Sequence, residues 1–310
     1  MQPRLLCVLQ IGFSIATAIL ACYSVPAFGV GQGGPGRYQC YHGYEPNAEP
    51  GMRFPIRGGG TLQVAGFTIE VKPDQNPSIP QEMSCHATIR SAKGDIVFQD
   101  YDEGMDIDAV TGKDINGDGQ PDAVIEAFSG GAHCCWTYFF VSLGPEPGLI
   151  QKFESKHSAS FKDLNGDGHI EIPVLDGAFD YFETAYSESP FPLLIIQLQG
   201  NEFRDISADF PKIYDEEIHE LRSGLNPNCV GDFLGAKWDD ICDYSSNRRG
   251  VLEIVLNYLY SGHPQDAWKA LEELWPAKDR ERIRSEILKG YCGGLRAELG
   301  VAAGSSCSEK

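Results

Sequence analysis

Two short segments place carboxylate and amide side chains at alternate positions of a glycine-rich run. The first reads Asp114-Ile-Asn-Gly-Asp-Gly-Gln-Pro-Asp122, and the second reads Asp163-Leu-Asn-Gly-Asp-Gly-His-Ile-Glu171. Ca²⁺ is a hard cation that takes about six to eight oxygen ligands at ~2.3–2.6 Å. Alternate residues of a tight turn can direct their oxygens at one centre, so this spacing predicts two Ca²⁺-binding loops.

Each segment supplies the same set of predicted ligands. Side-chain oxygens come from the first, third and fifth positions, a backbone carbonyl from the seventh, and a direct or water-mediated carboxylate from the ninth. The predicted ligands are Asp114, Asn116, Asp118, Gln120 and Asp122 in the first loop, and Asp163, Asn165, Asp167, His169 and Glu171 in the second. The alternative is two ordinary polar β-turns, because Asn-Gly and Asp-Gly are common turn formers.

The loops lack the hallmark of an EF-hand. Its twelfth position needs a bidentate glutamate, whereas Ile125 and Val174 stand there. The loops instead resemble those of the FG-GAP/VCBS repeat family over roughly residues 106–200. This resemblance implies exported β-repeats that bind Ca²⁺ between strands through the positions just named, although Glu171 replaces the usual aspartate. The two repeats are predicted at 106–154 and 155–200.

A second dense patch, residues 129–136, contains His133, Cys134 and Cys135. Adjacent residues of a strand point to opposite faces, which favours two separate disulfides. A vicinal disulfide and a zinc or copper site that includes His133 are the alternatives. In the same region His133 could meet Asp176, Asp180 and Glu183, which lie in the equivalent loops of the two repeats. The chain contains no serine nucleophile elbow, HExxH or P-loop motif, so we expect a non-catalytic protein rather than an enzyme.

The N-terminus has the features of an export signal. A basic residue, Arg4, precedes an apolar run over 5–21, and small residues follow, which predicts a signal peptide over 1–27. A retained membrane anchor is one alternative. Another is a lipoprotein signal over 1–21, because residues 19–22 look like a lipobox that would place a lipid on Cys22. Residues 28–36 form a glycine-rich flexible leader.

Charge and cysteine content agree with export. The chain has 25 Lys+Arg against 44 Asp+Glu, for a net charge of −19. This charge argues against nucleic acid as a partner, and it leaves the lipid on Cys22 as the only predicted contact with a membrane. Eight of the ten cysteines lie outside the signal region, and an even number in an exported chain predicts disulfides. Closeness in sequence favours Cys229–Cys242 and Cys292–Cys307.

The elements that must position the loops change type along the chain. From 37 to 214 the pattern is β-rich, with alternating runs at 61–65, 67–71, 85–89 and 95–98 and continuous apolar runs at 136–141 and 193–198. From 215 to 310 it is α-helical, with helices expected at 215–221, 251–259, 264–275 and 283–291. The fold class is therefore α+β. The helical pair around Gly262 looks like one TPR-type hairpin, or it is a plain helical cap on the β-rich domain.

The β-rich domain has two candidate architectures. The repeats of the resembled family build propellers, which need about four blades or more. Two clear repeats allow a partial propeller or an open β-sandwich. The sequence thus predicts an exported Ca²⁺-binding repeat protein, periplasmic or secreted, that binds or scaffolds an unknown protein or glycan ligand at the cell envelope. The alternative is an envelope or secreted hydrolase with a cleft formed by the repeat loops.

Overall fold

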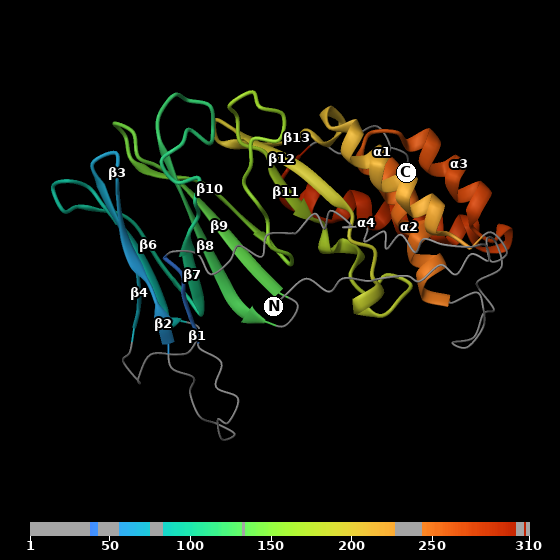
Figure 1. Ribbon diagram of the computed structural model, residues 1–310, viewed down its shortest axis with the longest axis horizontal. Coiled ribbons are helices and arrows are strands. Elements are labelled where there is room, and N and C mark those ends of the chain that lie inside the picture. The colour runs from blue at the N-terminus through green and yellow to red at the C-terminus, as the bar shows by residue number, and fades with distance from the viewer. Residues whose placement is uncertain are drawn as a thin grey trace, which may run out of the picture.

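The computed structural model describes residues 38–42, 56–74, 83–131, 134–226, 244–301 and 307. These residues form antiparallel sheets followed by helices, so the α+β class is confirmed (Figure 1). The predicted signal peptide, its alternative processing at Cys22 and the glycine-rich leader lie outside the described residues. Within the described ranges, no helix is long and apolar enough to span a membrane.

The N-terminal part consists of a six-stranded sheet and a four-stranded sheet, in both of which neighbouring strands are antiparallel. The six-stranded sheet has the order β10 (Gly148–Ser155), β9 (Cys134–Ser142), β8 (Asp122–Gly131), β7 (Gly104–Ile107), β1 (Cys40–His42) and β2 (Ile56–Gly58). The four-stranded sheet has the order β3 (Gly60–Val64), β4 (Phe67–Pro73), β5 (Cys85–Arg90) and β6 (Ile96–Asp102).

Period-two alternation explains how these two sheets meet. Ile125 of β8 and Val141 of β9 are fully buried and share one hydrophobic core with Ile69 and Val71 of β4. Their neighbours Val124 and Phe140 point to the opposite face and belong to a second core. The six-stranded sheet is therefore apolar on both faces. The described strands form neither a closed barrel nor a propeller.

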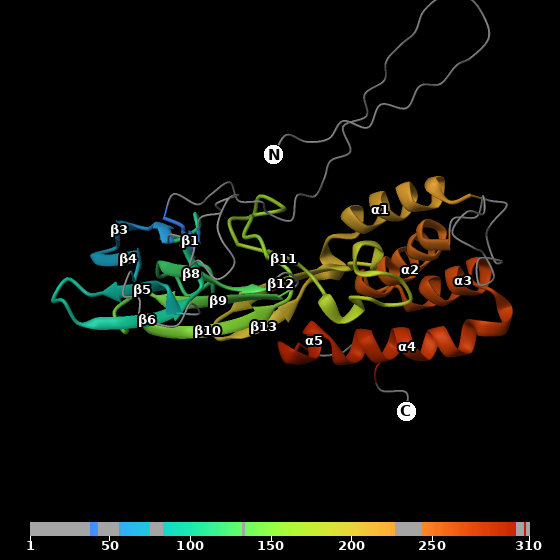
Figure 2. The ribbon, with the colours of Figure 1, turned by 90° about the horizontal axis from the view of Figure 1, so that it is seen from below.

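The second core joins a three-stranded sheet to the helices. The sheet contains β11 (Ile172–Leu175), β12 (Leu193–Gln199) and β13 (Glu202–Asp205). The helices are α1 (Pro211–Gly224), α2 (Tyr244–Tyr260), α3 (Pro264–Leu274), α4 (Arg280–Gly293) and α5 (Leu295–Glu298). Residues on both sides of Pro211, such as Ile196 and Val255, belong to this core. The three-stranded sheet lies between the larger sheets and the helices (Figures 1 and 2).

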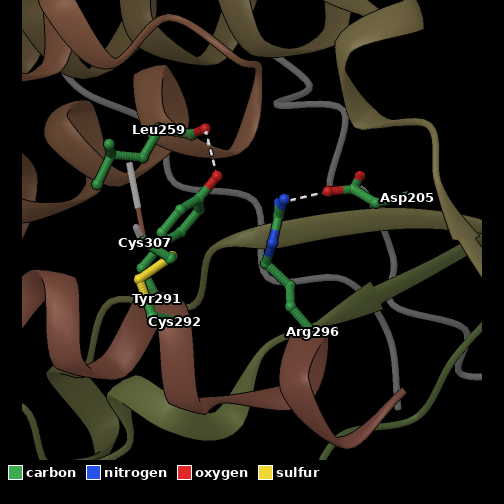
Figure 3. The surroundings of a disulfide bond; sticks show 6 residues. All are labelled: Asp205, Leu259, Tyr291, Cys292, Arg296 and Cys307. Atoms are coloured by element: carbon green, nitrogen blue, oxygen red, sulfur yellow. Dashed lines mark hydrogen bonds and ion pairs between the residues drawn. A yellow bond between two sulfur atoms is a disulfide. The ribbon is translucent and has the colours of Figure 1, made fainter. Parts of the chain in front are cut away.

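Disulfides fasten the first layers together and hold the C-terminus. Cys40 of β1 is bonded to Cys85 of β5, and both are fully buried between the two large sheets. The predicted Cys292–Cys307 bond is confirmed (Figure 3). Cys135 is also disulfide-bonded. The predicted Cys229–Cys242 pair and His133 fall outside the described residues.

Replacing Cys40 and Cys85 together by serine should lower the free energy of unfolding. Their bond joins residues 45 positions apart, and closing a loop of that length restricts the unfolded chain by about 4 kcal/mol in the loop-entropy model. Thermal melting of the exported, oxidised protein measures the loss.

The matched control is the double serine variant of Cys292 and Cys307, whose separation is 15 residues. This shorter loop corresponds to about 3 kcal/mol, so the control should melt between the wild type and the first variant. An unchanged melting temperature in the Cys40/Cys85 variant would contradict the structural role of that bond.

Candidate metal centre

The first loop is organised by the carboxylate of Asp114. Its Oδ1 accepts the backbone N–H groups of Gly117 at 2.8 Å and Asp118 at 3.2 Å, and its Oδ2 accepts that of Gly119 at 2.8 Å. Gly117 and Gly119 have φ angles of 79° and 83°, which L side chains rarely adopt. The alternating glycines therefore allow three consecutive N–H groups to turn towards one carboxylate.

The second loop repeats this arrangement. Asp163 Oδ1 accepts the N–H groups of Gly166 at 2.6 Å and Asp167 at 3.1 Å, and its Oδ2 accepts that of Gly168 at 3.0 Å. In both loops the third-position asparagine oxygen accepts the N–H of the fifth residue, and the fifth-position carboxylate accepts the N–H of the seventh. The duplicated sequence thus folds into duplicated local structure.

The ninth-position carboxylates lie at the buried base of each loop. Asp122 Oδ2 accepts the N–H of Ile115 at 2.8 Å, and Glu171 Oε2 accepts that of Leu164 at 2.6 Å. Asp122 is fully buried, and within the described residues its other oxygen, Oδ1, has no hydrogen-bond partner. Burial, with a smaller contribution from the charges of Asp118 and Asp114, raises the pKa of Asp122 to about 6, although the two backbone N–H groups act to lower it.

The two loops differ in burial. In the first loop Asn116 and Asp122 are both buried, at 7% and 0% exposure. In the second loop only the carboxylate at the ninth position, Glu171, is buried, whereas Asn165 is exposed. The first loop is also held by the second repeat, because Gly200 at the end of β12 donates its N–H to the carbonyl of Asn116 at 2.8 Å.

The donor set of each loop consists of hard oxygens, and the orphaned Asp122 Oδ1 is the kind of atom that a cation satisfies. Within the part of the chain that the structure describes, however, no three His, Cys, Asp or Glu side chains are gathered to hold a metal ion. The first-position carboxylates accept N–H groups of their own loops instead. Asparagine and carbonyl oxygens must therefore complete any coordination sphere, as the sequence pattern expects.

The described residues of the suggested catalytic cluster do not interact with one another but bind different partners. Asp176 is fully buried and accepts three hydrogen bonds, from the N–H groups of Ala178 and Leu295 and from the hydroxyl of Tyr260. Asp180 pairs with His157 at 2.9 Å. Glu183 pairs with Arg282 at 2.6 Å and lies 3.6 Å from Arg248. His133, the fourth residue of the suggested cluster, lies outside the described residues.

Sequence reasoning missed a cluster of acids on the sheet. Strand pairing places Asp106 of β7 opposite Glu126 of β8, and Glu126 opposite Tyr138 of β9. Burial, followed by a hydrogen bond with Asp108 and the charges of Asp108 and Asp106, raises the pKa of Glu126 to about 9. Glu126 therefore keeps its proton at neutral pH. The signal for it was a lone glutamate within an otherwise apolar strand.

Comparison of the chain with protein-family models, with curated proteins and with solved structures finds no match.

Replacing Glu126 by glutamine should stabilise the protein at pH 8 but not at pH 4. The folded state binds the Glu126 proton more tightly than the unfolded state. The contribution of protonated Glu126 to the free energy of unfolding is therefore complete below the unfolded-state pKa near 4.5, and it is lost as the pH rises through the folded-state pKa of about 9. Glutamine retains a neutral group without that dependence. The expected gain at pH 8 exceeds about 1.4 kcal/mol, the equivalent of one pKa unit.

Urea unfolding at both pH values, in the presence of EGTA, measures this difference. Glu154, an exposed glutamate of β10, supplies the matched control through Glu154→Gln, which should change little at either pH. Equal stability changes at pH 4 and pH 8 for Glu126→Gln would count against a protonated carboxyl group.

Replacing Asp176 by alanine should destabilise the fold by about 2–4 kcal/mol. The change leaves a buried hydroxyl and two backbone N–H groups without their acceptor, which is among the costlier losses in a protein interior. Chemical unfolding measures the loss, with Asp215→Ala on the exposed face of α1 as control. Wild-type stability in Asp176→Ala would show that Asp176 is not a structural residue.

Proposed function

We propose that this protein is an exported Ca²⁺-binding repeat protein of the FG-GAP/VCBS type, acting as a non-catalytic binding or scaffolding module for a protein or glycan at the cell envelope. The observation that supports it most directly is the fully buried Asp122 with one oxygen, Oδ1, left without a partner at the base of the first loop. A carboxylate in that position is costly unless it is protonated or paired with a cation.

The duplicated hydrogen-bond pattern supports the assignment of both loops to one purpose. A plain β-turn needs one or two glycines and no particular set of carboxylates around them. Here both loops carry acids at the first, fifth and ninth positions and an asparagine at the third. Without a cation these like charges repel one another, so the loops retain an electrostatic cost that bound Ca²⁺ removes.

Ca²⁺ fits these loops better than Mg²⁺ does. The oxygens come from side chains of different length and from the backbone, which suits the flexible coordination of Ca²⁺ and not the tight octahedron of Mg²⁺. Neither loop has the bidentate glutamate of high-affinity sites. We therefore expect dissociation constants of about 10⁻⁴–10⁻³ M, the range typical of extracellular modules.

The location follows from the same proposal. Disulfides form and persist in oxidising compartments, and the bonds Cys40–Cys85 and Cys292–Cys307 are compatible with a periplasmic or secreted protein. The export signal predicted over 1–27 would deliver the chain there. Lipidation at Cys22 would additionally tether it to a membrane.

Ca²⁺ should raise the melting temperature of the mature protein. An ion that binds only the folded state adds about 2.7 kcal/mol of stability at a hundredfold excess over its dissociation constant. Asp118→Ala should remove most of the effect of the first loop. Asp167→Ala should produce a smaller change, because the second loop is more exposed and Glu171 reaches the ion through a longer side chain. Differential scanning calorimetry in EGTA and in millimolar CaCl₂ measures these shifts.

Asp209→Ala, which removes an exposed aspartate outside both loops, is the matched control and should respond to Ca²⁺ as the wild type does. MgCl₂ at the same concentration should stabilise the wild type much less. The proposal fails if EGTA leaves the wild-type melting temperature unchanged and elemental analysis of the protein finds no calcium.

A further inference from the structure

A cavity of about 280 Å³ lies between the second repeat and the helices. It borders the second loop, because Lys162 and Leu164 on either side of Asp163 line it, but it includes no predicted Ca²⁺ ligand. Its lining is mostly apolar and includes Leu175 at the end of β11, Phe191 just before β12, Leu193 at the start of β12, and Ile213 and Tyr214 of α1. Its volume is near the lower limit of small-molecule sites, which begin at about 300 Å³. The cavity is therefore large enough for a compact ligand such as one substituted ring.

Asn257 combines deep burial with the absence of a side-chain hydrogen bond among the described residues. Asn257 of α2 is only 8% exposed, and within the described residues its side-chain amide makes no hydrogen bond. The main-chain carbonyl of Asn257, by contrast, accepts the N–H of Ser261. An amide that makes no hydrogen bond within the protein keeps its donor and acceptor capacity for another group. An amide that lines a cavity can use that capacity to bind a ligand.

The charged groups of the lining are paired or balanced, and its other polar side chains include the half-buried Ser158 and Ser160. Glu253 and Arg249 lie one and two helical turns before Asn257 on the same face of α2, and Arg249 Nε donates to Glu253 Oε1 at 2.8 Å. The remaining charged side chains are Glu217 of α1 and Lys162, both exposed at the rim. Two cations therefore face two carboxylates, and the lining has no net charge.

The electrostatics also disfavour a further carboxylate in this cavity. Burial raises the pKa of Glu253, although Arg249 and the N–H of Phe191 lower it in part. Partial burial and the charge of Glu220 raise the pKa of Glu217. An anionic ligand would meet these acids, and a cationic ligand would have to compete with the existing Arg249–Glu253 pair. A neutral ligand has neither cost.

A cavity of about 420 Å³ beside Asp176 is a weaker candidate. Its deepest polar group is Asp176, and both oxygens of that carboxylate are already used by protein donors.

The geometry points to the cavity between β11, β12, α1 and α2 as a binding site for a compact, neutral and mainly apolar molecule whose single hydroxyl or amide group hydrogen-bonds to Asn257. The apolar lining provides affinity, and the amide provides selection among molecules of the same shape. None of the predicted Ca²⁺ ligands lines this site, so the assignment does not rest on the proposed ion binding.

Four probes of one shape test the assignment: benzyl alcohol, toluene, benzoate and benzylammonium, titrated into the full mature protein at pH 7 and followed by NMR. Benzyl alcohol should bind most tightly, and its shifts should concentrate at residues of the cavity such as Ile213 and Asn257. Adding EGTA should leave its affinity unchanged, which separates this result from that of the Ca²⁺ experiments. Equal or tighter binding of benzoate or benzylammonium would overturn the neutral class, and absence of shifts at the cavity would overturn the site.

Two variants localise the interaction. Asn257→Leu should weaken benzyl alcohol about fivefold, the effect of one neutral hydrogen bond, while toluene binds as before or more tightly. Ile213→Trp, at a half-buried position, should fill the cavity and abolish binding of both, and it keeps the test decisive if Asn257→Leu does not fold. Asn201→Leu, at the exposed turn between β12 and β13, is the matched control. An equal loss of affinity for toluene and benzyl alcohol in a folded Asn257→Leu variant would show that Asn257 does not bind the hydroxyl group.

Discussion

The carboxylate of Asp176 is the interaction on which the helical half depends. It lies just after β11, and its two oxygens accept the N–H of Leu295 at the start of α5 and the hydroxyl of Tyr260 at the end of α2. A Cβ atom at Gly294 would lie 2.8 Å from Asp176 Oδ2, so only glycine fits beside it. Separating the helices from the three-stranded sheet would break the hydrogen bonds between the buried Asp176 carboxylate and its donors.

The C-terminal contacts reinforce the same junction (Figure 3). Arg296 pairs with Asp205 at the end of β13, and its guanidinium lies 4.6 Å from the ring centroid of Tyr291. The hydroxyl of Tyr291 donates to the carbonyl of Leu259 on α2. The adjacent Cys292–Cys307 bond then holds Cys307 to α4. This arrangement holds α2 in the place where its face of Arg249, Glu253 and Asn257 borders a cavity.

Local patterns predicted the elements well and their long-range partners poorly. Period-two alternation located β4, β5 and β6, and the proline at the start of α3 with its apolar stripe located that helix. The first helix was predicted from 215 to 221 but begins at Pro211 and ends at Gly224, because a proline at the first helical position was not weighed. The partners of Asp176 are 84 and 119 residues away, and no periodicity reports a contact at such a distance. The same limit hid the pairing of β7 with β1 and the cavity beside Asn257.

The two loops show that a motif can predict a local structure while its effect on the protein depends on the surrounding fold. Their glycines and acids predict the same turn twice, and the hydrogen bonds around Asp114 and Asp163 repeat almost unchanged. Among the described residues, only the first loop receives a hydrogen bond from the other repeat, through Gly200 and Asn116. Next to Gly200, the carbonyl of Asn201 accepts a hydrogen bond from Gln151 of β10. Ordering the first loop therefore also orders the contact between the two repeats, whereas ordering the second loop affects that loop alone. A cation held by the first loop would stabilise the packing of one repeat on the next, whereas a cation held by the second loop would stabilise a turn. Because the two motifs are alike, this difference follows from where each loop lies in the fold.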